Sequence, residues 1–243
     1  MSTFLDLLPQ TLDDVCEAGT IEVERDESRQ PGVADWARDA FAEEQIRSLV
    51  RQVFLPGWPK PAHQVVFSSV DPETDISAIC MQVGLALSEQ VAGTTCLVEA
   101  NLSGPGLGQV LEENGLDLVP KQEISPLRDS RRLSNELWLV SRTAFFGENG
   151  NGSSGPWLRD RLAELRQKYD YSVIYGPPAG TCSEAVLLAS LSDGIVLVVQ
   201  ANSTRRVAAQ KVKESLHSAN ARLLGAVLSE RSFPIPDAIY RKL

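Results

Sequence analysis

Residues 64–90 read QVVFSSVDPETDISAICMQVGLALSEQ, and this stretch predicts a strand, a tight loop and a helix in that order. Its first six residues are typical of a strand, whereas ISAICMQVGLALSEQ has the spacing of an amphipathic helix. A loop between such a strand and such a helix is the place of a phosphate-binding loop in nucleotide-binding proteins. This loop nevertheless has no glycine and no lysine, and it carries three carboxylates, Asp71, Glu73 and Asp75.

The loop lacks the groups with which a phosphate-binding loop holds its ligand. The pattern G-x-x-x-x-G-K-[ST] supplies backbone N–H groups around the phosphates, a lysine that neutralises them and a hydroxyl for Mg²⁺. Here Pro72 removes an N–H donor, Thr74 cannot cheaply adopt a glycine-only conformation, and Asp75 stands where the lysine would be. We expect this segment to face solvent and to be a vestigial nucleotide loop. Its residues are Asp71, Pro72, Glu73, Thr74, Asp75, Ile76 and Ser77.

The composition describes an ordinary globular chain with an acidic surface. The 243 residues are 43% hydrophobic and 23% charged, and the formal net charge is −9. This charge disfavours nucleic acid and anionic lipid as partners of the bulk surface, and the longest basic run, RDSRR at 128–132, is short. No apolar run approaches the roughly 20 residues of a membrane span, and the N-terminus lacks the pattern of a secretory signal.

The cysteines and histidines predict no metal site. Cys16, Cys80, Cys96 and Cys182 lie far apart without a C-x-x-C pair, and the chain has only two histidines. A structural zinc site needs ligands at closer spacing. Scattered cysteines of this kind are typical of a reducing compartment, and we therefore expect a cytoplasmic location.

The chain is expected to divide into an arm and one α/β domain. Residues 1–35 are polar and acidic, which predicts a weakly ordered N-terminal arm, either a disordered tail or a partner-docking segment. Residues 36–243 form the single domain. The expected strands are 64–69, 94–99, 136–141, 171–175, 195–200 and 223–228, and the expected helices are 35–54, 76–90, 156–168, 182–191 and 204–219. This alternation predicts an α/β fold, a mostly parallel sheet flanked by helices on both faces.

Two further strand ends carry residues by which the chain resembles a known family. Residues 96–111 read CLVEANLSGPGLGQVL and residues 169–180 read YDYSVIYGPPAG, at the edge of the sheet where α/β proteins bind ligands. Together with SDGIVLVVQANSTRR at 192–206, they resemble the cytoplasmic kinase domain of the bacterial tyrosine kinases of capsule and exopolysaccharide biosynthesis. That family belongs to the deviant-P-loop group of the MinD and ParA ATPases. The resemblance covers nearly all of the predicted domain and implies a deviant P-loop NTPase-like three-layer sandwich.

The chain departs from this family at the residues that would carry its chemistry. The family has P-G-E-G-K-[ST]-T in the loop, D-A-D-L-R-x-P after the second strand and D-T-P-P after the third. Here Glu99 and Asn101 replace the two aspartates, and Tyr175-Gly176 replaces Asp-Thr. The resemblance therefore implies that Glu99, Asn101 and Gly176 are vestigial acidic or metal positions, and we expect no catalytic residue, no metal and no cofactor. Ser77 and Glu99 remain as a hydroxyl and a carboxylate, and ATP with Mg²⁺ is expected only if the site is rearranged.

The resemblance also implies a surface for self-association. In the family an E-x-x-R-x-x-R helix joins subunits into a ring, and EEQIRSLVR at 43–51 is the corresponding stretch. Glu44 and Arg47 fit this pattern, but Arg51 comes one residue late, which displaces it by about 100° around a helix. Either these three residues form a homo-oligomer interface, or this face is exposed and carries a Glu43–Arg47 pair.

We expect the chain to be a non-catalytic, pseudokinase-like cytoplasmic subunit that regulates or scaffolds capsule and exopolysaccharide biosynthesis and export. The resemblance implies a transmembrane chain-length determinant (a polysaccharide co-polymerase) or a related kinase subunit as partner, and through it a location peripheral to the inner membrane. Nucleic acid is not expected as a partner. The alternative function is an active protein-tyrosine kinase or ATPase with a rearranged nucleotide site.

The carboxylates of the expected site leave two alternatives open. If the strand ends bring Asp71, Glu73, Asp75 and Glu99 into one neighbourhood, these groups repel one another or attract a cation. Alternatively, Asp75 caps the helix that begins directly after it, where a carboxylate is stabilising.

Overall fold

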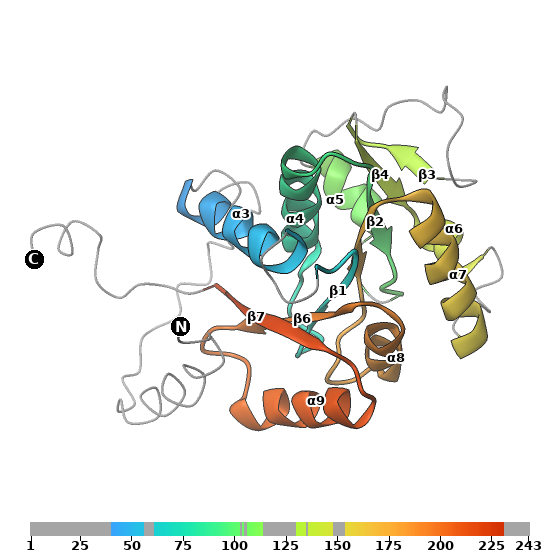
Figure 1. The fold of residues 1–243 in the computed structure, drawn as a ribbon. Coiled ribbons are helices and arrows are strands. Elements are labelled where there is room, and N and C mark those ends of the chain that lie inside the picture. Colours follow the sequence, from blue (N-terminus) through green and yellow to red (C-terminus); the bar gives the residue numbers. More distant parts are fainter. Residues whose placement is uncertain are drawn as a thin grey trace, which may run out of the picture. The chain divides into compact units, whose positions relative to one another are not determined.

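A seven-stranded sheet forms the centre of the protein (Figure 1). In this computed structural model the strand order is β3-β4-β2-β5-β1-β6-β7, and each neighbouring pair is parallel except β3 with β4. The strands are β1 Gln64–Ser69, β2 Thr95–Glu99, β3 Ser130–Arg132, β4 Leu137–Val140, β5 Tyr171–Tyr175, β6 Gly194–Gln200 and β7 Leu223–Ser229. The helices are α3 Ala40–Phe54, α4 Ser77–Gln90, α5 Leu107–Glu113, α6 Arg142–Phe146, α7 Gly155–Lys168, α8 Ser183–Leu191 and α9 Arg206–Ser218. The structure describes residues 40–55, 61–102, 104, 106–113, 130–134, 136–147 and 154–230.

Helices cover both faces of the sheet and form a separate core on each (Figure 1). On one face α3, α4 and α5 contribute Val50, Leu87 and Leu107, each fully buried. On the other face α6, α7, α8 and α9 form the second core, in which Phe145 and Leu158 are fully buried. A parallel sheet between two helical layers is the three-layer α/β fold that the alternating pattern predicts, and the prediction of fold class is confirmed.

The central strand β1 has no solvent-facing side, and its polar residues are buried with the rest. Gln64 Nε2 donates a hydrogen bond of 2.8 Å to the carbonyl of Leu162, and Ser68 Oγ donates one of 2.6 Å to the carbonyl of Pro177. Buried polar groups are tolerated when they are bonded in this way. The strand can therefore be enclosed completely although half of QVVFSS is polar.

The expected elements are confirmed, with small shifts at their ends. Each observed strand that was expected lies within one residue of its predicted bounds, and the expected helices α4, α7, α8 and α9 lie within two. The helix expected at 35–54 is observed from Ala40, where the described residues begin.

Three short elements are not predicted by the sequence pattern. The strand β3 comprises only three residues of the basic run at 128–132 and pairs antiparallel with β4. The helices α5 and α6 span seven and five residues, which are too few for a helical period to be recognised. All three are held by tertiary contacts rather than by a repeating pattern of their own.

Residues 1–39 lie outside the described residues, so the arm at 1–35 and the division at residue 36 stay predictions. Among the described residues, no helix combines the length and the apolar character that crossing a lipid bilayer requires.

A polar cluster at the opposite edge of the sheet, away from the strand ends of the expected site, joins β1 to β6. The Asp193 carboxylate accepts hydrogen bonds of 2.8 Å from the backbone N–H groups of His63 and Gln64. Its other oxygen accepts one of 2.9 Å from Arg166 Nη2 on α7. Burial alone would raise the pKa of Asp193, but these donors outweigh it and hold the pKa below its ordinary value. The carboxylate therefore stabilises the folded chain as an anion.

We predict that Asp193→Asn lowers the free energy of unfolding by about 1.5–3 kcal/mol at pH 7, the range for hydrogen bonds to a charged group. Because the pKa is lowered by folding, this stabilisation is present above the unfolded value of about 3.9 and is lost as pH falls through the folded value. Urea melts of both proteins from neutral to acidic pH measure the difference, which should narrow at low pH. Asp160→Asn on the exposed face of α7 is the control and should be neutral. A constant difference at every pH would contradict the assignment.

Candidate functional site

The carboxyl ends of neighbouring parallel strands bring the expected site residues to one edge of the sheet. Glu99 at the end of β2 lies opposite Tyr175 at the end of β5, and Tyr175 lies opposite Phe67 of β1. The loop at 71–77 follows β1. Gly176, which follows β5, donates a backbone hydrogen bond of 2.9 Å to the carbonyl of Phe67 in β1. The predicted residues are thus assembled at the edge where α/β proteins bind their ligands.

The loop at 71–77 is fastened to the end of β6. Thr74 Oγ1 donates a hydrogen bond of 3.1 Å to Gln200 Oε1, and the Asp71 carboxylate accepts one from the Thr204 hydroxyl. Thr74, Ile76 and Ser77 are only 7%, 1% and 1% exposed, so the prediction of a solvent-facing loop is wrong for these three side chains. Three residues of the loop are exposed: Pro72, Glu73 and Asp75.

The Asp75 carboxylate lies over the start of α4. One of its oxygens accepts a hydrogen bond of 2.9 Å from the backbone N–H of Ser77, and the other accepts one of 2.9 Å from Ser77 Oγ. Ser77 is the first residue of the helix, and its N–H is among the groups that a helix leaves without an internal partner. The N-cap position itself is Ile76, which has no side-chain acceptor, so Asp75, one residue earlier, supplies the acceptor for the helix start. This geometry favours a capping role for Asp75 over mutual repulsion.

The position of the helix start bears on how the loop compares with the phosphate-binding pattern. If Ser77 at the start of α4 is taken as the hydroxyl of G-x-x-x-x-G-K-[ST], then Ile76 occupies the lysine position and Asp75 that of the second glycine. In the alignment stated above, Asp75 itself occupies the lysine position. Neither alignment provides a cation, because Ile76 is apolar and buried and Asp75 is negative.

Glu99, at the end of β2, is paired with an arginine from α6, the helix that follows the neighbouring strand β4. Glu99 is 5% exposed, and its Oε1 atom lies 2.8 Å from Arg142 Nη2. Oε1 also accepts from the N–H of Leu107, and Oε2 from the N–H of Arg142, both at 3.3 Å. Arg142 extends further to the carbonyls of Leu102 and Gly104, at 3.3 and 3.4 Å. Both oxygens of Glu99 therefore have protein donors.

Arg142 is a site residue that the sequence analysis missed. It is the first residue of α6, and Ser141 caps that helix by accepting a hydrogen bond of 3.3 Å from the N–H of Ala144. The sequence ELWLVSR contains a usable signal, since an arginine directly follows an apolar strand. Its relation to Glu99 depends on β4 lying beside β2, as the register shows.

Tyr175 fills the space between the ends of β2 and β5. Asn101 Nδ2 donates a hydrogen bond of 2.9 Å to the Tyr175 hydroxyl, and burial raises the pKa of Tyr175 to about 12. The phenol is therefore neutral at physiological pH. At Gly176 a Cβ atom would lie 2.8 Å from Val66 Cγ1, so the packing leaves no room for a side chain there.

Three of the four carboxylates of the expected acidic cleft are each bonded to a different partner, and the fourth, Glu73, is exposed. Asp71 bonds to Thr204, Asp75 bonds to Ser77, and Glu99 pairs with Arg142. Across the described part of the chain, no three His, Cys, Asp or Glu side chains gather closely enough to hold a metal ion. The prediction of crowded carboxylates is therefore not supported by this geometry.

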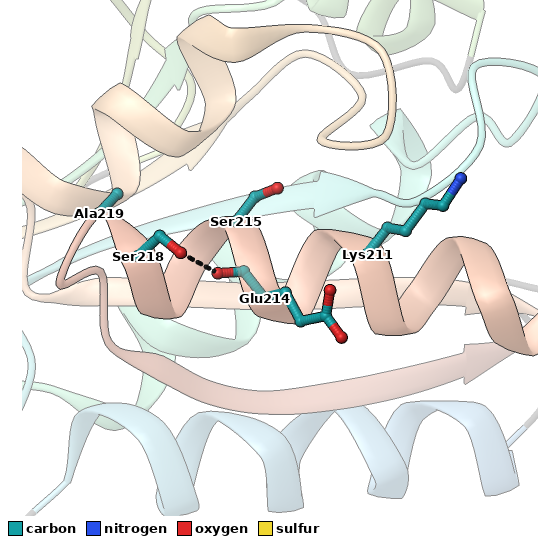
Figure 2. A pocket seen from close by; sticks show the side chains of 5 residues that line it. All are labelled: Lys211, Glu214, Ser215, Ser218 and Ala219. Atoms are coloured by element: carbon teal, nitrogen blue, oxygen red, sulfur yellow. Dashed lines mark hydrogen bonds between the residues drawn. The ribbon is translucent and has the colours of Figure 1, made fainter.

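Two open hollows lie along α8 and α9. Figure 2 shows the first, of about 700 Å³, which is lined by residues of α9 together with Ala219. The second, of about 460 Å³, lies between α8, α9 and the loop at 179–182. Neither hollow is lined by Glu99 or by the loop at 71–77.

The expected self-association residues lie on α3. Arg47 Nη2 is 2.8 Å from Glu43 Oε1, so the predicted Glu43–Arg47 pair is confirmed. Arg51 Nη1 is 3.5 Å from Glu44 Oε1, and Arg51 Nε donates to Gln90 Oε1 of α4 at 3.2 Å. These contacts are internal to the chain, and the homo-oligomer interface stays a prediction.

We predict that Asp75→Asn melts no higher than the wild type at either low or high salt, because the carboxylate caps α4 rather than repelling its neighbours. Asp75→Ala should lower the free energy of unfolding by about 1 kcal/mol through loss of the cap. Thermal melts at two salt concentrations measure both, and Glu73→Gln, at an exposed position in the same loop, is the control. A melting temperature for Asp75→Asn that rises at low salt would restore the repulsion hypothesis.

We predict that Arg142→Met destabilises the fold by about 3 kcal/mol, because it leaves a buried carboxylate without its cation. The lower end of the usual range applies because the Arg142 side chain is 30% exposed. The double variant Glu99→Gln with Arg142→Met should recover at least half of the loss, and Arg159→Met on exposed α7 should be neutral. Denaturant melts measure all three variants. Equal loss in the single and double variants would show that the ion pair is not the cause.

Comparison with known proteins places the chain in a family. It is 32% identical over 191 residues to the tyrosine-protein kinase YwqD of Bacillus subtilis (strain 168), which covers 76% of this chain and 80% of that protein. It is 35% identical over 74 residues to the tyrosine-protein kinase CpsD of Streptococcus agalactiae, or 30% of this chain and 32% of that protein. No protein-family model matches the chain.

Solved structures show the same fold. The VpsO kinase domain superposes with a TM-score of 0.60 at 21% identity, covering 79% of this chain and 97% of that one. The kinase domain of the Escherichia coli tyrosine kinase ETK gives 0.58 at 14% identity, covering 93% and 89%. The MinC:MinD complex of Aquifex aeolicus gives 0.53 at 16% identity, covering 74% and 72%. With its match to YwqD along most of both chains, this protein belongs to the bacterial tyrosine-protein kinases of capsule and exopolysaccharide biosynthesis.

Proposed function

We propose that this chain is a non-catalytic, pseudokinase-like member of its family that regulates or scaffolds capsule and exopolysaccharide biosynthesis. The observation that carries the proposal is that the charges at the strand ends are satisfied by the chain itself. Asp75 is bonded to Ser77 at the start of α4, and Glu99 is paired with Arg142. Phosphoryl transfer depends on positioning phosphates and metal with free charges at such an edge.

The start of α4 offers a poor place for phosphate. Helix N-termini attract anions through their free N–H groups and the helix dipole. Here the Asp75 carboxylate already accepts the N–H of Ser77. A phosphate in this place has to displace that carboxylate or lie beside its charge, and residues 70–77 contain no lysine or arginine to compensate. The loop therefore favours its own anion over a bound one.

The residues around Glu99 do not fit a magnesium ion. Mg²⁺ requires oxygen ligands in near-octahedral geometry and is held by carboxylates together with substrate phosphates. Both oxygens of Glu99 already accept hydrogen bonds, and the guanidinium of Arg142 supplies a positive charge beside them. A cation here has to replace Arg142, and Asn101 and the neutral Tyr175 add no negative charge.

The alternative is an active tyrosine kinase or ATPase with a rearranged site. It is favoured by the names of the relatives, which are tyrosine-protein kinases, and by the hydroxyl and carboxylate that Ser77 and Glu99 retain. Those two groups are engaged with Asp75 and Arg142 in this structure. The alternative thus requires both contacts to open, whereas the non-catalytic role needs only the fold and its surfaces.

The non-catalytic role places the chain in the cytoplasm, beside a membrane partner. Family membership supports a transmembrane chain-length determinant, or a related kinase subunit, as that partner. One of the structural neighbours is the chimerical protein CapA2B2, which superposes with a TM-score of 0.58 at 18% identity and covers 81% of this chain and 87% of that one. A scaffold of this kind needs a rigid domain, which the doubly covered sheet provides.

Isothermal titration calorimetry separates the two functions. We predict no saturable heat with Mg-ATP or Mg-ADP up to high micromolar ligand, because Asp75 and Arg142 occupy the places of phosphate and metal. The same chain titrated with the cytoplasmic segment of a chain-length determinant from the same genome should give saturable heat. The kinase domain of Escherichia coli ETK serves as the nucleotide-binding control.

Saturable Mg-ATP binding by this chain would overturn the non-catalytic proposal and support the alternative. Binding of neither nucleotide nor the chain-length determinant would leave the non-catalytic part standing and contradict the scaffold part.

A further inference from the structure

The outward side of α9 and its flanks form a basic surface on an acidic protein. Residues 205–222 contain five cations and one carboxylate, a net charge of +4, whereas the whole chain carries −9. The remaining residues therefore sum to −13. The basic surface consists of Arg205, Arg206, Lys211, Lys213 and Arg222.

Most of these cations are not neutralised within the domain. Among the described residues, no ion pair engages Arg205, Lys211, Lys213 or Arg222. Elsewhere in the described part of the chain, ion pairs engage Arg47, Arg51, Arg142, Arg161, Arg166 and Lys168. Arg131 and Arg159 also lack an ion pair among the described residues, but they are single positions on β3 and α7, whereas four such cations lie within residues 205–222.

The cations of α9 lie on the two flanks of its outward face, because Lys211 and Lys213 are two positions apart and point about 160° apart around the axis, with Glu214 between them. Val212 and Leu216 are buried in the core beneath the helix. Lys211 and Lys213 are exposed, and Figure 2 shows Lys211 extending away from the helix axis, with Glu214 leaving in a different direction. Val207, in the first turn, is 61% exposed, so the same surface also presents an apolar side chain.

We propose that this basic surface of α9 lies against an anionic lipid surface and holds the domain peripherally at the membrane without another protein. A helix of 13 residues is about 20 Å long, and its cations are distributed along that length, as suits a flat layer of headgroups. Each cation near such a surface strengthens binding by about fivefold. Val207 favours lipid over a nucleic acid backbone, because an apolar side chain is stabilised at the boundary between headgroups and acyl chains.

The negative charge of the rest of the chain does not prevent this contact. At about 0.1 M salt the Debye length is about 10 Å, so exposed charges farther away are largely screened. Only the surface facing the lipid then determines the interaction. The proposal is independent of nucleotide binding, and calorimetry with Mg-ATP does not bear on it.

Vesicle sedimentation tests the proposal with the whole chain. Wild-type protein should sediment with vesicles of phosphatidylglycerol and phosphatidylcholine in equal parts, but not with phosphatidylcholine alone, and high salt should release it. The charge reversal Lys211→Glu with Lys213→Glu should weaken binding by about 20-fold or more. Val207→Ser should weaken it by a smaller factor.

A matched control separates local from overall charge. Arg131→Glu with Arg159→Glu makes the same change in net charge at exposed positions on β3 and α7, and it should leave vesicle binding unchanged. Lys211→Gln with Lys213→Gln covers the case in which charge reversal disturbs the fold, and circular dichroism melts verify folding.

Equal loss in the α9 and control variants, or no binding to the anionic vesicles, would overturn the proposal. Duplex DNA and polyglutamate are included as competitors in the same assay. If either one binds the wild type through Lys211 and Lys213 while anionic vesicles do not, the surface serves a different class of partner and the lipid proposal is wrong.

Discussion

Parallel hydrogen bonding of β1 to β5 and β6 is the constraint on which the other features depend. It places the strand between two layers of helices, so that every residue of QVVFSS is buried. It also makes the loop after β1 emerge at the same edge as the ends of β2 and β5. Residues that are far apart in the sequence, such as Asp75, Glu99 and Tyr175, meet there because the strands end together. The side chains at these positions therefore determine the charge and the hydrogen bonding of the site.

At this edge the protein neutralises its own charges. A carboxylate occupies the anion-attracting start of α4, and a guanidinium lies beside Glu99, the acidic residue that ends β2. These contacts contribute to the stability of the fold. In the non-catalytic function proposed above, they give the strand ends a structural role within the retained family fold.

The sequence predicts this fold well because buried strands and amphipathic helices each have a recognisable period. The loop at 71–77 was identified for the same reason, as was the pairing of Glu43 with Arg47. Arg142 could not be placed beside Glu99, since that contact depends on the order of β4 and β2 within the sheet. The cations at 205–222 can be read from the sequence, but only the structure shows that Lys211 and Lys213 are exposed on either side of the buried Val212. Exposure and contacts between distant segments require the structure.

The packing at Gly176 constrains how this chain could change over evolutionary time. Its missing Cβ would lie 2.8 Å from Val66 Cγ1, in the completely buried strand β1. A lineage that acquired a side chain at position 176 would first have to make residue 66 smaller, which leaves a cavity in the core. Either change made alone passes through a less stable protein. The core itself therefore opposes a side chain at this strand end, independently of any selection on function.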